Sequence, residues 1–227
     1  MEYDTEAANI CCPVLGKEGC EVGTNRGCLT CYPCAVTSSA VLPLFLKTGA
    51  YLQGHFRLTS GLHSGEYLQC AKVLAFPEYA EFLGQEIAKK IPASSVQVVV
   101  SPAMGGIVIG HEVARALKVR SLFAERDSST KEMTLRRGFE VKPGERAVVI
   151  EDVITTGGST KEVVRLLQGL GAKVVAAGSI IDRSGGAADV EVPRVALETL
   201  KAVTYSPDTC PLCQQGIPLV KPGSRPT

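Results

Sequence analysis

The hydrophobic positions of this chain form two alternating patterns from about residue 39 onward. Runs of consecutive Val, Ile and Ala lie at 96–101, 147–150 and 173–181. Such runs are typical of strands that are buried on both faces of a parallel sheet. The segments between them repeat apolar residues every three or four positions, as amphipathic helices do. The alternation predicts an α/β fold, with a mostly parallel sheet flanked by helices.

Four helices are expected from the second pattern. The first is short and has Pro43 in its first turn, where a missing N–H costs little. The last has Val163 and Leu167 on one face and is closed by Gly171. The expected helical segments cover residues 40–47, 77–91, 106–117 and 160–170.

The strands of this predicted sheet are followed by small, polar or charged residues. Ligands of open parallel sheets bind at the carboxyl ends of the strands. Three segments follow strands here, at 102–106, 151–160 and 182–183. We therefore expect the functional site to be built from these three segments.

The first residues of the chain follow neither pattern. Residues 1–38 are rich in Cys and Gly, and six of the nine cysteines lie there. We expect three parts: a Cys-rich extension at 1–38, a catalytic domain at 39–205 and a tail at 206–227.

Charge and composition narrow the classes of function. The 24 Lys and Arg residues nearly balance the 23 Asp and Glu residues, so no global charge points to nucleic acid or to a membrane surface. The chain has no apolar run of the roughly 20 residues that span a bilayer and does not begin with a secretory signal. We expect a cytoplasmic protein. Because the overall charge is close to zero, any phosphate would be bound by a local group of residues.

The segment EDVITTGGST at 151–160 carries the strongest chemical signal. Its glycines allow a backbone to approach an anion, and the first amides of the following helix and the hydroxyls can donate to a phosphate. Glu151 and Asp152 would repel phosphate but can accept hydrogen bonds from sugar hydroxyls or from hydrated Mg²⁺. Ribose 5-phosphate has both a phosphate for the glycines, amides and hydroxyls and sugar hydroxyls for the two acids. For a Gly-Gly pair alone, simple helix capping would be the better interpretation.

The whole string VVIEDVITTGGST closely resembles the phosphoribosyl pyrophosphate signature of type I phosphoribosyltransferases. Other segments look like those of the orotate phosphoribosyltransferases of pyrimidine (UMP) synthesis, including GHFRLTSGLHSGEYLQ, SPAMGGIVIGHEVARAL and IIDRSGG. The tail beginning CPLC resembles that of one bacterial branch. The resemblance covers about residues 41–225 and implies the type I phosphoribosyltransferase fold with a small N-terminal hood.

The resemblance implies roles for individual residues. Glu151 and Asp152 would bind the ribose hydroxyls, and Asp152 would be central to catalysis. Thr155 and Arg183 would bind orotate, for which a guanidinium is physically suited. The pyrophosphate would lie on the 102–106 backbone, with Mg²⁺ as cofactor. The residues implied to hold phosphoribosyl pyrophosphate at the signature loop are Glu151, Asp152, Val153, Ile154, Thr155, Thr156, Gly157, Gly158 and Ser159.

The segment 125–137 resembles the mobile basic loop that closes over pyrophosphate in the neighbouring subunit of this family. The resemblance therefore implies a homodimer. Arg126 and Lys131 would contact phosphoribosyl pyrophosphate, with Lys131 as the candidate catalytic lysine of the loop. The chain departs from the family pattern at Glu125, Thr59 and Gly105, so the roles of the residues usual there are not transferred.

The remaining cysteines leave alternatives open. Cys28, Cys31 and Cys34 form a CxxCxxC run, and Cys210 and Cys213 form CPLC; thiolates at this spacing could bind zinc or an iron–sulfur cluster. Residues 1–38 could instead be a flexible extension or the result of a mis-set translation start. Other functions for the fold are a phosphoribosyltransferase for another base and a non-catalytic nucleotide-sensing or competence-associated protein. Segment 54–64 and Arg183 favour orotate, and the neutral overall charge argues against a nucleic-acid-binding regulator.

Overall fold

The computed structural model describes residues 41–58, 60–92, 96–201 and 203–222. The chain divides into two units, Met1–Thr37 and Ser38–Thr227. The first unit, with Cys28, Cys31 and Cys34, lies outside the described residues, as does Thr59. Everything below concerns the second unit.

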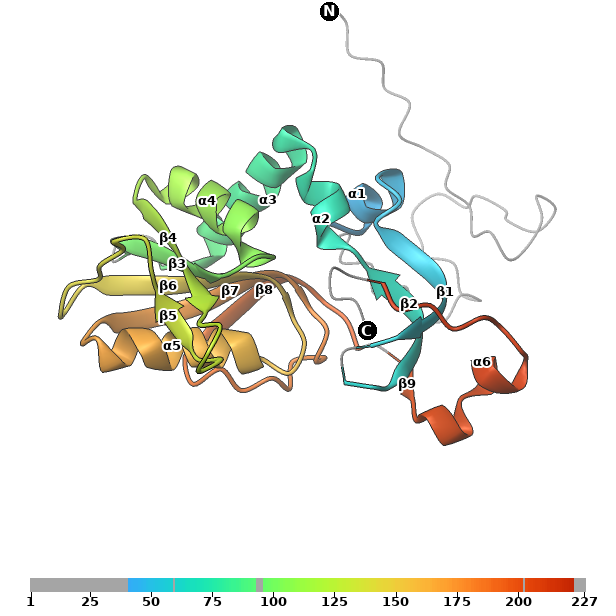
Figure 1. Ribbon diagram of the computed structural model, residues 1–227. Helices are drawn as coiled ribbons and strands as arrows, with labels where there is room; N and C mark the ends of the chain where they lie inside the picture. Colours follow the sequence, from blue (N-terminus) through green and yellow to red (C-terminus); the bar gives the residue numbers. More distant parts are fainter. Residues whose placement is uncertain (1–40, 59, 93–95, 202, 223–227) are drawn as a thin grey trace, which may run out of the picture. The chain divides into compact units, whose positions relative to one another are not determined.

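Six strands form the central sheet, in the order β5-β4-β3-β6-β7-β8 (Figure 1). All neighbouring pairs are parallel except β4 and β5, which form an antiparallel hairpin at one edge. This confirms the predicted mostly parallel sheet. The strands are β3 (Val98–Pro102), β4 (Arg120–Arg126), β5 (Met133–Leu135), β6 (Arg146–Ile154), β7 (Lys173–Asp182) and β8 (Arg194–Thr199).

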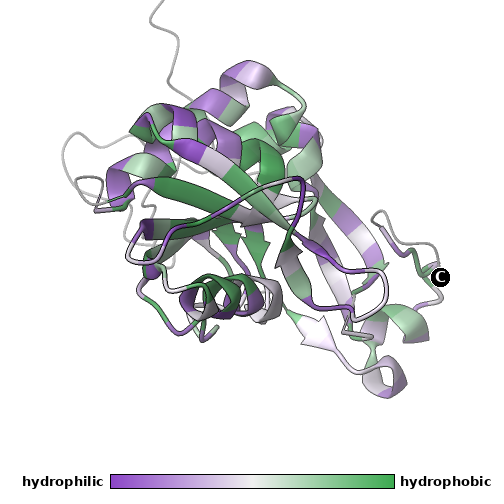
Figure 2. Cartoon of the chain, turned by 60° about the vertical axis from the view of Figure 1, so that its left-hand side comes forward, coloured by the Kyte–Doolittle hydropathy of each residue, from purple (hydrophilic) through white to green (hydrophobic). Residues whose placement is uncertain are grey.

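Helices cover both faces of this sheet. In β3, Val99 packs into one core with the helices α1 to α4, whereas Val98 and Val100 pack into the other with α5. The central strands are correspondingly hydrophobic (green) between helices of mixed character in Figure 2. The helices are α1 (Val41–Lys47), α2 (Cys70–Leu74), α3 (Pro77–Lys90), α4 (Gly106–Leu117) and α5 (Gly158–Gly169). None of the helices in the described part of the chain could cross a bilayer.

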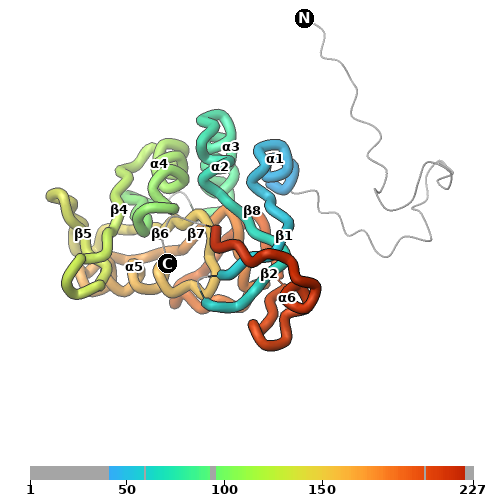
Figure 3. The backbone as a smooth tube through the Cα atoms, turned by 45° about the vertical axis from the view of Figure 1, so that its right-hand side comes forward, coloured from blue at the N-terminus to red at the C-terminus, as the bar shows by residue number. Residues whose placement is uncertain are grey.

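A second, smaller sheet combines residues from both ends of the described chain. The hairpin of β1 (Tyr51–Arg57) and β2 (His63–Leu68) pairs with β9 (Thr204–Tyr205) near the C-terminus. Beyond β9 come the short helices η2 (Pro207–Thr209) and α6 (Pro211–Gln214). The red C-terminal segment runs beside the hairpin in Figure 3. This sheet corresponds to the expected hood, but the tail is part of it.

The boundary that differs most from the sequence-based expectation is the end of β6. We expected residues 151–159 to form a loop, whereas Glu151 to Ile154 continue strand β6. Their backbone pairs with β7 as far as Ile154 and Asp182. Val153 and Ile154 have β-branched side chains, which favour strands. Strand β7 is also long enough to supply backbone hydrogen-bond partners for them. The two acids therefore project from a rigid strand.

Candidate active site

The connection from β6 to α5 has the geometry of an anion-binding loop. Thr155, Thr156 and Gly157 link the strand to the helix, and Gly157 is left-handed with φ 82°. A Cβ at Gly157 would lie 2.9 Å from Cγ1 of Val190, so the position requires glycine. Helical hydrogen bonding begins with the Lys161 amide, which donates to the Gly157 carbonyl at 2.8 Å. The amides of residues 158–160 therefore precede the first helical bond and can donate to an anion.

A cavity of about 680 Å³ opens over this loop. It includes every residue from Val153 to Ser159 that the sequence assigns to phosphoribosyl pyrophosphate, together with Glu151 and Arg126. Arg57, Tyr67 and Lys221 are among the further residues that line this cavity and had no role predicted from the sequence. Arg57 and Tyr67 come from the hood hairpin and Lys221 from the tail, so only the fold brings them to the loop. Their residue types gave no signal, because the chain has 24 Lys and Arg residues.

Glu151 and Asp152 differ in their surroundings. Glu151 is only 9 % exposed, and burial, reinforced by the charge of Asp152, raises the pKa of its carboxyl well above 4.5. Asp152 lies against the loop after β3, where a Cβ at Gly105 would be 2.7 Å from Oδ1 of Asp152. Glycine at 105 is therefore what allows the carboxylate to reach this position.

A second cavity of about 460 Å³ adjoins the first and shares several lining residues with it. Asp152, Thr155 and Arg183 line it together, as expected from their places at the ends of β6 and β7. The Arg183 amide donates to the Ile154 carbonyl at 2.8 Å, which fixes the two strand ends beside each other. Burial lowers the pKa of the Arg183 guanidinium. The cavity therefore offers several cations and hydroxyls to a small anionic ring, among them the guanidinium of Arg183 and the hydroxyl of Thr155.

The basic segment 125–137 forms most of the β4–β5 hairpin and its flanks. Arg126 lines the larger cavity, donates to the Lys131 carbonyl at 2.8 Å and pairs with Glu162 at 2.7 Å. Lys131 lies in the turn, where its ammonium donates to the Ser128 carbonyl at 2.6 Å, and it does not line the described cavities. Arg137 forms a two-bonded pair with Glu125, at 2.8 and 2.9 Å. Of the two candidate loop residues, the fold therefore brings only Arg126 to this subunit's own loop.

Comparison with known proteins gives a consistent result. Residues 75–205 match the phosphoribosyl transferase domain family. The orotate phosphoribosyltransferase of Pelotomaculum thermopropionicum is 54% identical over 190 residues, which cover 84% of this chain and 99% of that protein. That of Thermotoga maritima is 57% identical over 179 residues, covering 79% and 95%.

Solved structures agree. The crystal structure of orotate phosphoribosyltransferase from Aeropyrum pernix superposes with a TM-score of 0.62 at 28% identity, covering 71% of this chain and 94% of that one. The signature loop, the paired cavities and these relatives lead to one assignment. The chain belongs to the orotate phosphoribosyltransferases, within the phosphoribosyltransferase family.

Proposed function

We propose that the two adjoining cavities transfer the phosphoribosyl group of phosphoribosyl pyrophosphate to orotate, giving orotidine 5′-phosphate and pyrophosphate. The observation that carries this proposal is that Thr155 lines both the cavity over the anion-binding loop and the adjoining cavity, which Asp152 and Arg183 also line. The 5-phosphate lies on the loop and amides of residues 155–159, and the ribose hydroxyls donate to Glu151 and Asp152. Orotate lies in the smaller cavity, against Arg183 and Thr155.

The reaction displaces pyrophosphate from C1 of the ribose by N1 of orotate. The C1–N1 bond forms as the C1–O bond to pyrophosphate breaks, through a transition state with oxocarbenium character. The N1 proton of orotate leaves as the C1–N1 bond forms, and the departing pyrophosphate, which takes the electron pair of the C1–O bond, or water accepts it. What the chain supplies is alignment of the two reactants by the loop, the acids and Arg183, and cationic groups near the leaving group.

We infer that the cofactor is Mg²⁺. Glu151 and Asp152 present carboxylate oxygens beside the phosphate loop, and such hard donors suit this ion. When bound, Mg²⁺ would neutralise charge on the pyrophosphate oxygens. In this proposal, the ion is held chiefly by the substrate, and Asp152 and Glu151 position its water and the ribose.

We further propose a homodimer in the cytoplasm, in which the β4–β5 hairpin of one subunit reaches the site of its partner. Arg126 lines the cavity of its own subunit, whereas Lys131 points into the hairpin turn. If the hairpin places Lys131 in the site of a second subunit, the different positions of Arg126 and Lys131 are explained.

The substitution Asp152→Asn tests the site. Asparagine has the same shape, so it fits against Gly105, but it removes the charge that receives the ribose hydroxyls. We expect turnover to fall about a hundredfold while the melting temperature stays close to that of the unsubstituted chain. Orotate consumption with phosphoribosyl pyrophosphate and Mg²⁺ measures the effect. Activity like that of the unsubstituted chain would refute the assignment of Asp152.

A further inference from the structure

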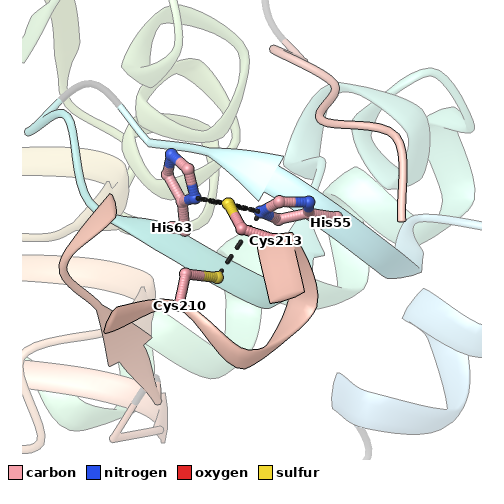
Figure 4. Close-up of side chains that lie close together, drawn as sticks. All are labelled: His55, His63, Cys210 and Cys213. Carbon is pink, nitrogen blue, oxygen red and sulfur yellow. Dashed lines mark hydrogen bonds between the residues drawn. The ribbon is translucent and has the colours of Figure 1, made fainter. Parts of the chain in front are cut away.

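A cluster of four metal-ligating side chains lies in the hood, outside the cavities described above. It consists of His55 and His63 from the hairpin and Cys210 and Cys213 from the tail. One candidate ligand atom from each residue lies within 4.8 Å of every other. Figure 4 shows the four side chains pointing toward one another. His55 is 2 % exposed, His63 5 % and Cys210 1 %, so three of the four side chains are shielded from water, whereas Cys213 is exposed.

Three of the four distances below match the edges of a tetrahedron around zinc, and the fourth, between the two histidine nitrogens, is shorter. Nε2 of His55 lies 2.9 Å from Nδ1 of His63, 3.6 Å from Sγ of Cys210 and 3.7 Å from Sγ of Cys213. Nδ1 of His63 lies 3.4 Å from Sγ of Cys213. With zinc bonds of about 2.0–2.3 Å, the ligand atoms of such a site are separated by about 3.3–3.8 Å.

Hydrogen bonding cannot account for this convergence. Nε2 of His55 has three polar atoms within 3.7 Å, yet one ring nitrogen carries either a single lone pair or a single proton. Buried polar atoms without partners are costly. One cation with four coordination positions would satisfy all four groups at once.

The orientation of His55 supports a metal ligand. Its other ring nitrogen, Nδ1, lies 2.7 Å from the carbonyl oxygen of Ile217. Since a carbonyl only accepts, Nδ1 carries the proton and Nε2 presents its lone pair to the cluster. Histidines that bind metals are typically held by such a bond to the backbone.

The local backbone explains how the cluster forms. The β1–β2 register shifts between Gln53 and Phe56, and this bulge places His55 and Phe56 as successive buried residues. Cys210 precedes α6, and the Gln214 amide donates to its carbonyl at 3.2 Å, so one short turn brings both thiols to the same side. These features come from two segments that lie about 150 residues apart in sequence, as the pairing of Cys213 with His63 shows.

We propose that His55, His63, Cys210 and Cys213 bind one structural zinc ion that ties the C-terminal tail to the hood. Two thiolates and two imidazoles in a tetrahedron suit zinc, whereas Mg²⁺ and Ca²⁺ prefer oxygen ligands. Four protein ligands leave no open coordination position, which is typical of a structural site. Binding releases the two thiol protons to solvent.

The apolar side chains of the tail are only partly buried, so a metal ion would add substantially to its attachment. Ile217, Leu219 and Val220 remain 37 %, 44 % and 51 % exposed. Backbone bonds join Val220 to the hairpin at His55 and Arg57, both at 2.8 Å, and Lys221 then lines the catalytic cavity. The zinc ion would therefore hold Lys221 at the catalytic site from a distance.

Metal content and coordination test the proposal directly in the full-length chain. To remove the contribution of the N-terminal segment, the measurements use a chain in which six cysteines are replaced by serine: Cys11, Cys12, Cys20, Cys28, Cys31 and Cys34. Purified after growth with zinc, it should contain about one equivalent of zinc. X-ray absorption should show two sulfur ligands at about 2.3 Å and two nitrogen ligands at about 2.0–2.1 Å.

Single substitutions in this background give the decisive comparison. Cys213 is exposed, so Cys213→Ser is sterically mild, yet it and His63→Gln should reduce zinc below about a tenth of an equivalent. His111→Gln is the matched control, because His111 is exposed on α4, and it should keep the zinc. Hydrogen exchange of residues 204–222 should rise in the first two variants and not in the control.

Several results would overturn the proposal. They are absence of zinc, zinc retained by Cys213→Ser, coordination without sulfur or with sulfur alone, iron in place of zinc, and a Cys210–Cys213 disulfide in the chain as purified. None of these readouts depends on turnover of orotate, so the zinc site and the proposed reaction can fail separately.

Discussion

At the scale of single residues, the two neighbouring acids of the signature, Glu151 and Asp152, lie in different surroundings. The carboxyl of Glu151 is buried beside Asp152, and its pKa is raised well above 4.5. A buried acid with a raised pKa lowers stability once the pH exceeds its ordinary pKa, because the folded state then has to hold a desolvated charge or retain a proton. The empty site is therefore expected to be less stable near neutral pH than it would be with a neutral side chain at 151.

The substitution Glu151→Gln tests this cost. At pH 4.5 the variant and the unsubstituted chain should unfold with similar free energies, since the acid is largely protonated when folded. As the pH rises toward 8, the variant should become progressively more stable than the unsubstituted chain, while its activity falls. Denaturant unfolding across this pH range measures the difference. Glu140→Gln, at an exposed site, should show no such gain; an equal gain there, or none in Glu151→Gln, would contradict the stated cause.

Arg183 is expected to recognise orotate through its planar fork. Lysine keeps the charge but cannot make two parallel bonds to a carboxylate. Arg183→Lys should therefore raise KM for orotate about tenfold or more, with a smaller change in KM for phosphoribosyl pyrophosphate. Arg165→Lys on α5, where the arginine pairs with Glu191, is the control and should leave both constants unchanged. Equal increases in both constants for Arg183→Lys would argue against a specific orotate contact.

Sequence alone could predict that Thr155 and Arg183 meet. Each follows or ends a parallel strand, and the carboxyl ends of neighbouring parallel strands lie at one edge. The same rule could not predict that Arg57 and Lys221 lie at the catalytic cavity. Nor could it predict that the two histidines and two cysteines of the hood lie close together. These residues meet through an antiparallel hairpin with a bulge and a tail that returns to it, and long-range pairings of this kind leave no periodic signal in the sequence.

At the scale of elements, the three apolar runs and four helical segments are found with ends shifted by a few residues, whereas β4, β5, β8 and α2 were not predicted from their patterns. The largest shift is in β6, which extends to Ile154 because β7 offers backbone partners beyond the apolar run. A strand boundary of this kind depends on the neighbour and not on the segment itself. The basic segment at 125–137 was likewise expected as a loop and in fact contains part of a hairpin, with Met133 to Leu135 paired to β4.

The turn of this hairpin provides the next prediction. Lys131→Ala should lower turnover about tenfold or more while changing the affinity for orotate little, because the lysine is proposed to act on the departing pyrophosphate. Lys118→Ala is a closely matched control, since Lys118 and Lys131 have the same left-handed backbone, with φ 58° and 62°. Steady-state kinetics and direct orotate binding separate the two effects. An equal loss of turnover and orotate affinity would contradict the role proposed for the loop.

At the scale of the whole molecule, the site combines distant parts of the chain. The main sheet supplies the signature loop and Arg183, whereas the hairpin and tail supply Arg57, Tyr67 and Lys221. The proposed dimer would add Lys131 from a partner. In the proposed enzyme, catalysis depends on the hood and on dimer formation as well as on the signature loop.

Complementation between defective subunits tests the shared site. Asp152→Asn and Lys131→Ala are each expected to be impaired alone. If Lys131 acts in the partner's site, then co-expressed chains should form mixed dimers with one intact site, restoring about a quarter of the activity per chain of the unsubstituted enzyme. If each Lys131 serves its own subunit, the mixture should show only the average of the two separate variants.

The central claim is that the two cavities form one site whose acceptor is orotate. The most direct test incubates the enzyme with phosphoribosyl pyrophosphate, Mg²⁺ and equal concentrations of orotate, uracil, adenine and hypoxanthine, and follows all four nucleotides. Because Arg183 and Thr155 present a cation and a hydroxyl to a small anionic ring, orotidine 5′-phosphate should form almost exclusively. Preferential formation of any other nucleotide, or no product from orotate, would contradict it.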